Sequence, residues 1–157
     1  MQLMIKTGSH YRAARRDEIL STAIGFAVQD APREVLSSPA AVIRALQRLI
    51  SARDIEAFYC MALDTRHGCL AFSELFTGTL DGAPVFPREV ARWALAQNAA
   101  ALVVCHNHPS GHLEPSPADE AITRWLKDAL GLFDIRLLDH FIVTSAGTYS
   151  FAEHGLI

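Results

Sequence analysis

The sequence predicts a single α/β domain in which a mixed β-sheet is flanked by helices. Apolar runs of strand length, such as residues 57–63 and 101–105, alternate along the chain with stretches of helical periodicity. The chain has 157 residues, half of them apolar, which is enough to bury the core of one domain. Turn-forming residues 64–68 separate two strand-like runs, so we expect a hairpin there.

The N-terminal part gives a weaker helical signal. Residues 12–29 carry apolar side chains at helical spacing, but Gly25 lies inside the pattern. We expect residues 1–36 to form a helical extension and residues 37–157 to form the main domain. An appended helix and a partner-binding arm are two interpretations of this extension.

The main domain opens with a well-marked helix. Ser38 suits the N-cap position, and Pro39 suits the first helical position. The apolar stripe of this helix consists of Val42, Ile43, Leu46, Leu49 and Ile50. The all-apolar run of residues 101–105 predicts a buried central strand. The other expected elements are strands over residues 57–63, 69–80, 135–144 and 147–151, and helices over residues 87–98 and 117–130.

Composition argues against nucleic acid as the main ligand. The chain has 14 basic and 17 acidic side chains and a formal charge of −3, so it has no basic excess to bind phosphates. One small basic cluster, Arg12, Arg15 and Arg16, is interpreted as a solvated helix face.

The cysteines and the apolar segments indicate the cellular compartment. Cys60, Cys69 and Cys105 are odd in number and form no CxxC pair, so a disulfide framework is not expected. The sequence has no signal-like or membrane-length apolar segment. We therefore expect a cytoplasmic protein without a membrane partner. A homodimer is an alternative to a monomer.

The most informative segment runs from Cys105 to Asp119. His106 and His108 are two residues apart at the end of an apolar run, which places both rings on one face of a strand. Asp119 lies in the first turn of an expected helix, from which its carboxylate can turn back toward the two imidazoles. Two histidines and one aspartate leave the fourth position of a tetrahedral Zn²⁺ open for water, which is the layout of a catalytic site.

Several residues near this segment have two interpretations. Ser116 and Asp119 also fit a capping box, which explains both without a metal and is compatible with one. His112 and Glu114, in the loop between the ligands, face either substrate or water. Within an apolar strand, Asp139 and His140 either orient a metal-binding histidine or form a structural pair. Asn107 is expected to point away from the histidines and to support the framework.

The motif resembles that of a known family. The pattern His-x-His-Pro, six residues, Ser, two residues, Asp is similar to the metal signature of the JAMM/MPN metalloproteases. The surrounding sequence resembles the RadC-like (UPF0758) branch. The matching segments are Leu75-Phe-Thr-Gly-Thr-Leu, Pro87-Arg-Glu-Val, Asn98-Ala-Ala-Ala-Leu, His106-Asn-His-Pro-Ser-Gly and Leu138-Asp-His. The ending Ser150-Phe-Ala-Glu-His-Gly-Leu resembles the short RadC-like proteins of prophages and mobile elements.

The resemblance implies a JAB/MPN-type fold and a zinc-dependent hydrolase of peptide or isopeptide bonds. His106, His108 and Asp119 match the zinc ligands of the family. Glu56 matches the glutamate that deprotonates the attacking water, with Glu74 as the competing candidate. Ser116 matches the serine that stabilises the developing oxyanion. The implied partner is a peptide or protein substrate, whose identity the sequence does not give.

Other functions were weighed against hydrolysis. The chain lacks the His-x-Glu and Pro-Cys-x-x-Cys signature of zinc deaminases, and the contiguous His-Asn-His is not the arrangement of an HNH nuclease. The main alternative is a non-catalytic partner-binding or DNA-binding module in DNA repair or mobile-element maintenance, in which zinc serves folding alone. The full-length family carries a helical domain that resembles DNA-binding modules, but residues 1–36 are too short for it. A toxin–antitoxin or mobile-element accessory protein is a third alternative.

Overall fold

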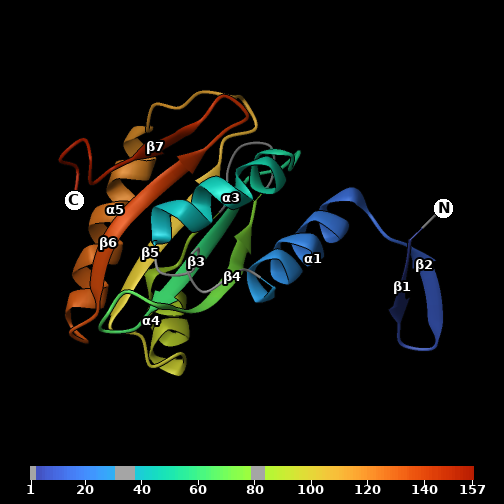
Figure 1. Cartoon of the computed structure of the whole chain (residues 1–157), viewed down its shortest axis with the longest axis horizontal. Helices are drawn as coiled ribbons and strands as arrows, with labels where there is room; N and C mark the ends of the chain where they lie inside the picture. Colours follow the sequence, from blue (N-terminus) through green and yellow to red (C-terminus); the bar gives the residue numbers. More distant parts are fainter. Residues whose placement is uncertain (1–2, 31–37, 79–83) are drawn as a thin grey trace.

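The computed structural model describes residues 3–30, 38–78 and 84–157, and is built around a five-stranded sheet (Figure 1). The sheet has the order β4-β3-β5-β6-β7. Its strands are β3 (Ala57–Leu63), β4 (Cys69–Thr77), β5 (Ala101–Asn107), β6 (Arg136–Val143) and β7 (Thr148–Ser150). The predicted end of the hairpin strand at residues 79–80, like residues 1–2 and 31–36 of the predicted extension, lies outside the described residues.

The sheet is mixed, as predicted. β3 pairs antiparallel with both β4 and β5, β5 pairs parallel with β6, and β6 pairs antiparallel with β7. The parallel pair is connected by helix α5 (Pro117–Gly131), because parallel neighbours need a crossover. Every residue of β3 and β5 is buried, as expected for the centre of a sheet covered on both faces.

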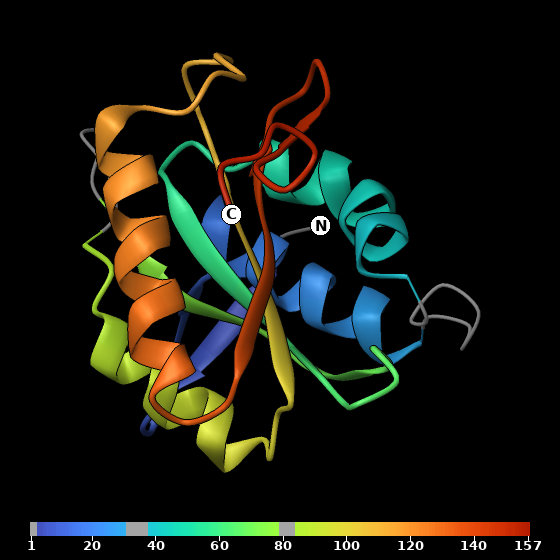
Figure 2. The same cartoon turned by 90° about the vertical axis from the view of Figure 1, so that its left-hand side faces the viewer.

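Helices cover both faces of the sheet (Figure 2). On one face, α3 (Pro39–Ser51) packs with α1 (Arg16–Gln29) over a core that includes Tyr59 and Cys105. On the other face, α4 (Pro87–Ala96) packs with α5 over a core that includes Phe58 and Val104. Successive side chains of a strand alternate between the two faces. His106, two residues after Val104, therefore points toward the α5 face.

Helix starts are fixed locally, as the sequence predicted. The Ser38 side chain accepts a hydrogen bond from the amide of Ala41, and Pro39 begins α3. At the start of α5, the Ser116 side chain accepts from the amide of Asp119, and the Asp119 side chain accepts from the amide of Ser116. This reciprocal capping box fixes the backbone from which Asp119 projects.

The N-terminal extension is not wholly helical, which corrects our expectation for residues 1–36. The expected helix begins only at Arg16, and it is preceded by a hairpin of β1 (Met4–Thr7) and β2 (His10–Ala13). Gly8, with a φ of +63°, and the following serine form the two-residue turn of this hairpin. A Gly-Ser pair between two short runs is a hairpin signal in the sequence that we did not use.

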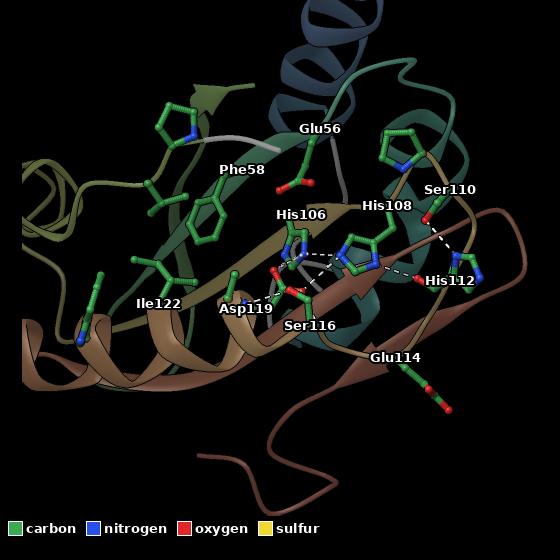
Figure 3. A pocket seen from close by; sticks show the side chains of 15 residues that line it. Glu56, Phe58, His106, His108, Ser110, His112, Glu114, Ser116, Asp119 and Ile122 are labelled. Carbon is green, nitrogen blue, oxygen red and sulfur yellow. Dashed lines mark hydrogen bonds and ion pairs between the residues drawn. The ribbon is translucent and has the colours of Figure 1, made fainter. Parts of the chain in front are cut away.

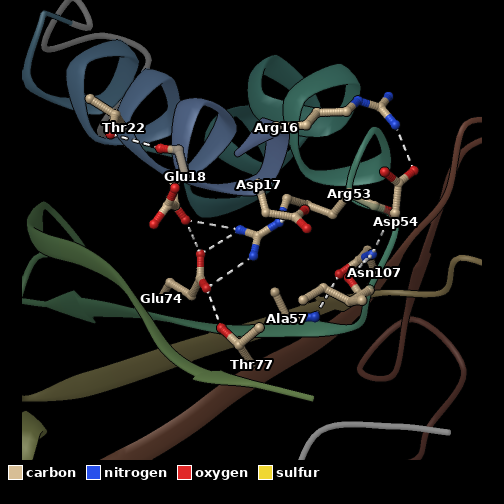
Figure 4. Close-up of polar contacts among 12 residues, drawn as sticks. Arg16, Asp17, Glu18, Thr22, Arg53, Asp54, Ala57, Glu74, Thr77 and Asn107 are labelled. Atoms are coloured by element: carbon tan, nitrogen blue, oxygen red, sulfur yellow. Dashed lines mark hydrogen bonds and ion pairs between the residues drawn. The ribbon is translucent and has the colours of Figure 1, made fainter. Parts of the chain in front are cut away.

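A buried arginine fastens α1 to the sheet (Figure 4). The Arg53 guanidinium donates to Glu74 at 2.6 and 3.2 Å and to Asp17 at 2.7 Å. It also reaches the hydroxyls of Ser21 at 2.9 Å and Tyr59 at 3.1 Å. Burial acts to raise the pKa of the Glu74 carboxyl, but hydrogen bonds, first that from Arg53, outweigh this effect and hold the pKa below its usual range.

We predict that Arg53→Met lowers the free energy of unfolding by about 2–3 kcal/mol, because it leaves Glu74 partly buried without its cation. In the control Arg16→Met, only the exposed pair with Asp54 is lost, and the cost stays below about 1 kcal/mol. Urea unfolding measures the free energy of unfolding of both variants.

The loss of stability in Arg53→Met also depends on pH. Protonated Glu74 needs no cation, so the loss shrinks as the pH falls below the ordinary carboxyl range. Equal losses in the two variants would contradict the assignment.

Candidate metal centre

Two adjacent elements bring the three predicted ligands together. His106 lies near the end of β5 and His108 just past it, where the amide of His108 donates to the carbonyl of Val143 at 3.2 Å. Asp119 lies in the first turn of α5, which returns from the loop that follows β5. Figure 3 shows the three side chains converging on one point.

The distances between the ligand atoms fit one small cation. His106 Nε2 lies 2.9 Å from His108 Nε2 and 3.2 Å from Asp119 Oδ1. His108 Nε2 lies 3.4 Å from Asp119 Oδ2. One atom from each residue lies within 4.8 Å of the others, and the His106 side chain is only 1% exposed. The three groups therefore form a compact, largely buried ligand set.

A chain of hydrogen bonds fixes the tautomer of His106. The Thr123 hydroxyl donates to the carbonyl of Asp119 at 2.6 Å, so it accepts from Nδ1 of His140 at 2.7 Å. Burial lowers the pKa of His140 well below its usual value, so the ring is neutral and its Nε2 is an acceptor. His140 Nε2 lies 2.8 Å from His106 Nδ1, which is therefore the donor. Nε2 of neutral His106 consequently carries a lone pair.

His108 is oriented in the same sense by a main-chain group. Its Nδ1 lies 2.7 Å from the carbonyl oxygen of His112, which can only accept, so Nδ1 is the donor. In neutral His108, Nε2 therefore carries the lone pair, and it faces Nε2 of His106. Two facing lone pairs beside a carboxylate repel one another unless a cation lies between them. The donor set therefore fits a divalent metal such as zinc.

The electrostatics of the site also favour positive charge. Burial acts to lower the pKa of His108, but the hydrogen bond to Asp119 outweighs it and raises the pKa. Burial acts to raise the pKa of Asp119, but hydrogen bonds to His106 and His108 hold it well below its usual range. Asp119 is thus ionised, and the point between the rings stabilises a cation.

The strand register places Glu56 beside the ligand set. Phe58 is paired with His106 across β3 and β5, so Glu56, two residues earlier, lies opposite His108 in an antiparallel pair. Glu56 and Phe58 share the face that carries the histidines. Both line the same groove as His106, His108 and Asp119, and Figure 3 shows the Glu56 carboxylate pointing into it.

Ser116 lines the groove as well as capping α5. Its hydroxyl donates to Asp119 Oδ2 at 2.6 Å and accepts from the Asp119 amide at 3.1 Å. The hydroxyl can reach a substrate oxygen only by rotating away from Oδ2. A metal ion bound to the Asp119 carboxylate would compete with the Ser116 hydroxyl for Oδ2, and the hydroxyl could then rotate toward a substrate.

The structure separates the remaining candidates. Glu74 does not line the groove: it shares the opposite face with Tyr59 and is paired with Arg53. His112 and Glu114 both line the groove. Asp139 has a structural role, because it accepts from Ser150 Oγ at 2.6 Å and from the amide of Ala152 at 3.0 Å.

Two residues support the site without lining the groove: Asn107, which the sequence predicted, and Thr123, which it did not. Asn107 supports the framework as predicted, accepting from the amide of Ala57 at 2.8 Å and donating to the carbonyl of Ile55 at 3.0 Å. Thr123 was missed. Its position one helical turn after Asp119 was the available signal, since residues four apart lie on the same side of a helix.

Fold and site together define a JAB-type α/β domain with a candidate metal centre. The model of the family described as "RadC-like JAB domain" matches residues 36–156, so the chain belongs to this family. The resemblance to its prophage and mobile-element members stays a prediction.

Among the described residues, no helix is long and apolar enough to cross a membrane.

Curated relatives are similar over most of this chain. A UPF0758 protein of Nitrosococcus oceani is 56% identical over 124 residues, which are 79% of this chain and 55% of that protein. A UPF0758 protein of Xanthomonas euvesicatoria is 55% identical over 122 residues, which are 78% of this chain and 54% of that protein. The chain thus spans about half the length of the curated relatives it matches.

We predict that Thr123→Val weakens zinc binding by about 10- to 100-fold, because His140 and then His106 lose their fixed tautomers. Thr123→Ser keeps the hydroxyl and restores the affinity. The matched control is Ser150→Ala, which removes another buried hydroxyl outside the hydrogen-bond chain and leaves zinc affinity unchanged. Competition with a chromophoric chelator gives the three affinities. An unchanged affinity in folded Thr123→Val would contradict the role of this chain of hydrogen bonds.

Proposed function

We propose that the protein is a zinc-dependent hydrolase of peptide or isopeptide bonds. The observation that carries the proposal is the convergence in one groove of His106, His108 and Asp119 with Glu56 and Ser116. A site that only held a structural metal would not need a further carboxylate, that of Glu56, lining the same groove. Membership of the JAB family is compatible with this chemistry.

The residues take separate roles in the proposed reaction. Bound zinc would supply an activated water and polarise the scissile carbonyl. Glu56 takes a proton from the water as its oxygen bonds to the carbonyl carbon. The Ser116 hydroxyl donates to the oxygen that becomes negative. Glu56 then gives its proton to the nitrogen as the carbon–nitrogen bond breaks, which leaves a carboxylic acid and an amine.

The metal is tested first. We predict that the purified protein holds about one zinc ion per chain, and that His108→Ala loses most of it. The control is His112→Ala, because His112 contributes only its main-chain carbonyl to the orientation of His108 and therefore keeps the zinc. Elemental analysis after dialysis measures the content. Full zinc in His108→Ala would refute the ligand assignment.

The general base is tested with two carboxylates. We predict that Glu56→Gln keeps the zinc, but that its rate of hydrolysis falls about 10²-fold or more for a peptide that the native chain cleaves. The reason is that an amide cannot accept the proton of water. Glu74→Gln keeps the activity and loses stability, since it weakens the pair with Arg53. Rates from a peptide-library screen and thermal unfolding distinguish the two. Retained activity in Glu56→Gln would exclude this base.

The DNA-binding alternative finds little support on the surface. Two carboxylates offset most of the charge of the three-arginine cluster in the N-terminal part, because Arg12 and Arg15 contact Glu18 and Arg16 contacts Asp54. We predict that duplex DNA binds more weakly than about 1 µM near physiological salt, with fluorescence anisotropy as the measurement. Tighter binding would favour the module over the hydrolase.

A further inference from the structure

The groove that holds the candidate metal centre has two unlike sides (Figure 3). Ser110, His112 and Glu114 lie on one side of the ligand set. Phe58 and Ile122 lie on the other side. Val85 and Trp125 also line the groove, and Val85, like Ile122, packs against the core cluster that contains Phe58. We call Phe58, Val85, Ile122 and Trp125 the apolar shelf.

Helix α5 extends the shelf away from the metal centre. Ala118, Ile122 and Trp125 follow the spacing i, i+4, i+7 and form one stripe on the groove side of the helix. The buried side of the same helix carries Thr123 and Leu126. Trp125 is 64% exposed, so its ring is not held by the core and is free to contact a ligand.

The floor of the shelf is aromatic and rigid. Phe58 is 2% exposed and lies parallel to the ring of His106, with centroids 6.2 Å apart. Its ring also contacts that of Phe76, which packs in turn against Phe86 in a T-shaped pair. A floor anchored in this way would not have to rearrange to accept a flat or branched apolar group.

The charges of the residues that line the groove favour an apolar side chain of a substrate over an acidic one. Among the described residues that line it, none is a lysine or an arginine, whereas Glu56, Glu114 and Asp119 are acidic. On the shelf, away from the metal, an acidic side chain of a substrate would therefore meet like charge and no basic partner. A neutral apolar side chain loses nothing by this charge and gains contact with the shelf.

The dimensions relate the shelf to the bond that is cleaved. With a rise of about 1.5 Å per residue, Ile122 lies ~4.5 Å and Trp125 ~9 Å beyond Asp119 along the helix axis. An extended peptide advances about 3.4 Å per residue. A peptide that runs along α5 with its carbonyl at the ligand set would therefore carry side chains one to three residues beyond that carbonyl over the shelf.

We propose that the apolar shelf binds a large apolar side chain of the substrate within three residues of the scissile bond. The substrate class is then a peptide or isopeptide with an aromatic or branched aliphatic residue at this position. The inference rests on the proposed function, because the scissile carbonyl defines the position of the shelf.

Hydroxamates test the shelf because they bind zinc and carry different tails. The zinc-loaded full chain is titrated calorimetrically with acetohydroxamate, with phenylacetohydroxamate, and with a hydroxamate of similar length that ends in a carboxylate. We expect the phenyl compound to bind about tenfold more tightly than the methyl compound, and the carboxylate compound to bind more weakly than either. In Trp125→Ala and Ile122→Ala, the ratio of phenyl to methyl affinity falls toward one.

The control is Leu132→Ala, which removes an apolar side chain that is 82% exposed at the end of the same helix and outside the groove. This variant keeps the native ratio. Equal binding of the phenyl and methyl compounds to the native chain would overturn the inference and leave the proposed function standing. The same holds if the ratio of phenyl to methyl affinity falls as far in Leu132→Ala as in the two shelf variants. Failure to hold zinc at all would overturn both.

Discussion

The antiparallel pairing of β3 with β5 is the constraint on which the site depends. It sets Phe58 opposite His106 and therefore brings Glu56 beside His108. Asn107 holds this register, because its side chain bonds the amide of Ala57 and the carbonyl of Ile55. A slip of one residue would turn every side chain of β3 to the other face and separate the carboxylate from the histidines.

The start of α5 makes a second contribution, in which helix capping and ligand placement are the same contacts. Ser116 and Asp119 satisfy each other's amides, which would otherwise lack partners in the first turn. The Asp119 side chain is thereby held near both imidazoles. Thr123, one turn later, accepts from His140 and donates to the carbonyl of Asp119. Because His140 in turn contacts Nδ1 of His106, this helix also orients His106. Local helix chemistry thus supplies both the carboxylate and the tautomer of a histidine.

Sequence reasoning succeeded where one local rule determined the outcome. The strand of residues 57–63 and the start of α3 at Pro39 follow from apolar runs and capping, and the clustering of His106, His108 and Asp119 follows from their spacing. It failed where distant segments decide the structure. The contacts of His140 depend on the pairing of β5 with β6 and on α5, which no local pattern contains. The N-terminal hairpin is local and was missed for another reason: its strands are four residues long, and apolar periodicity is uninformative at that length.

Glu56 and Glu74 show how the fold gives one residue type two roles. Glu74 is paired with Tyr59 across β4 and β3, so it points to the face that α1 covers and meets the buried Arg53. Glu56 lies on the alternate face, where it lines the groove together with Phe58. A carboxylate neutralised by an arginine is a poor acceptor of a proton, because its pKa is lowered. The alternation of side chains along the strands therefore places Glu74 under α1, where it serves stability, and places Glu56 in the groove, where the proposed function gives it the role of general base.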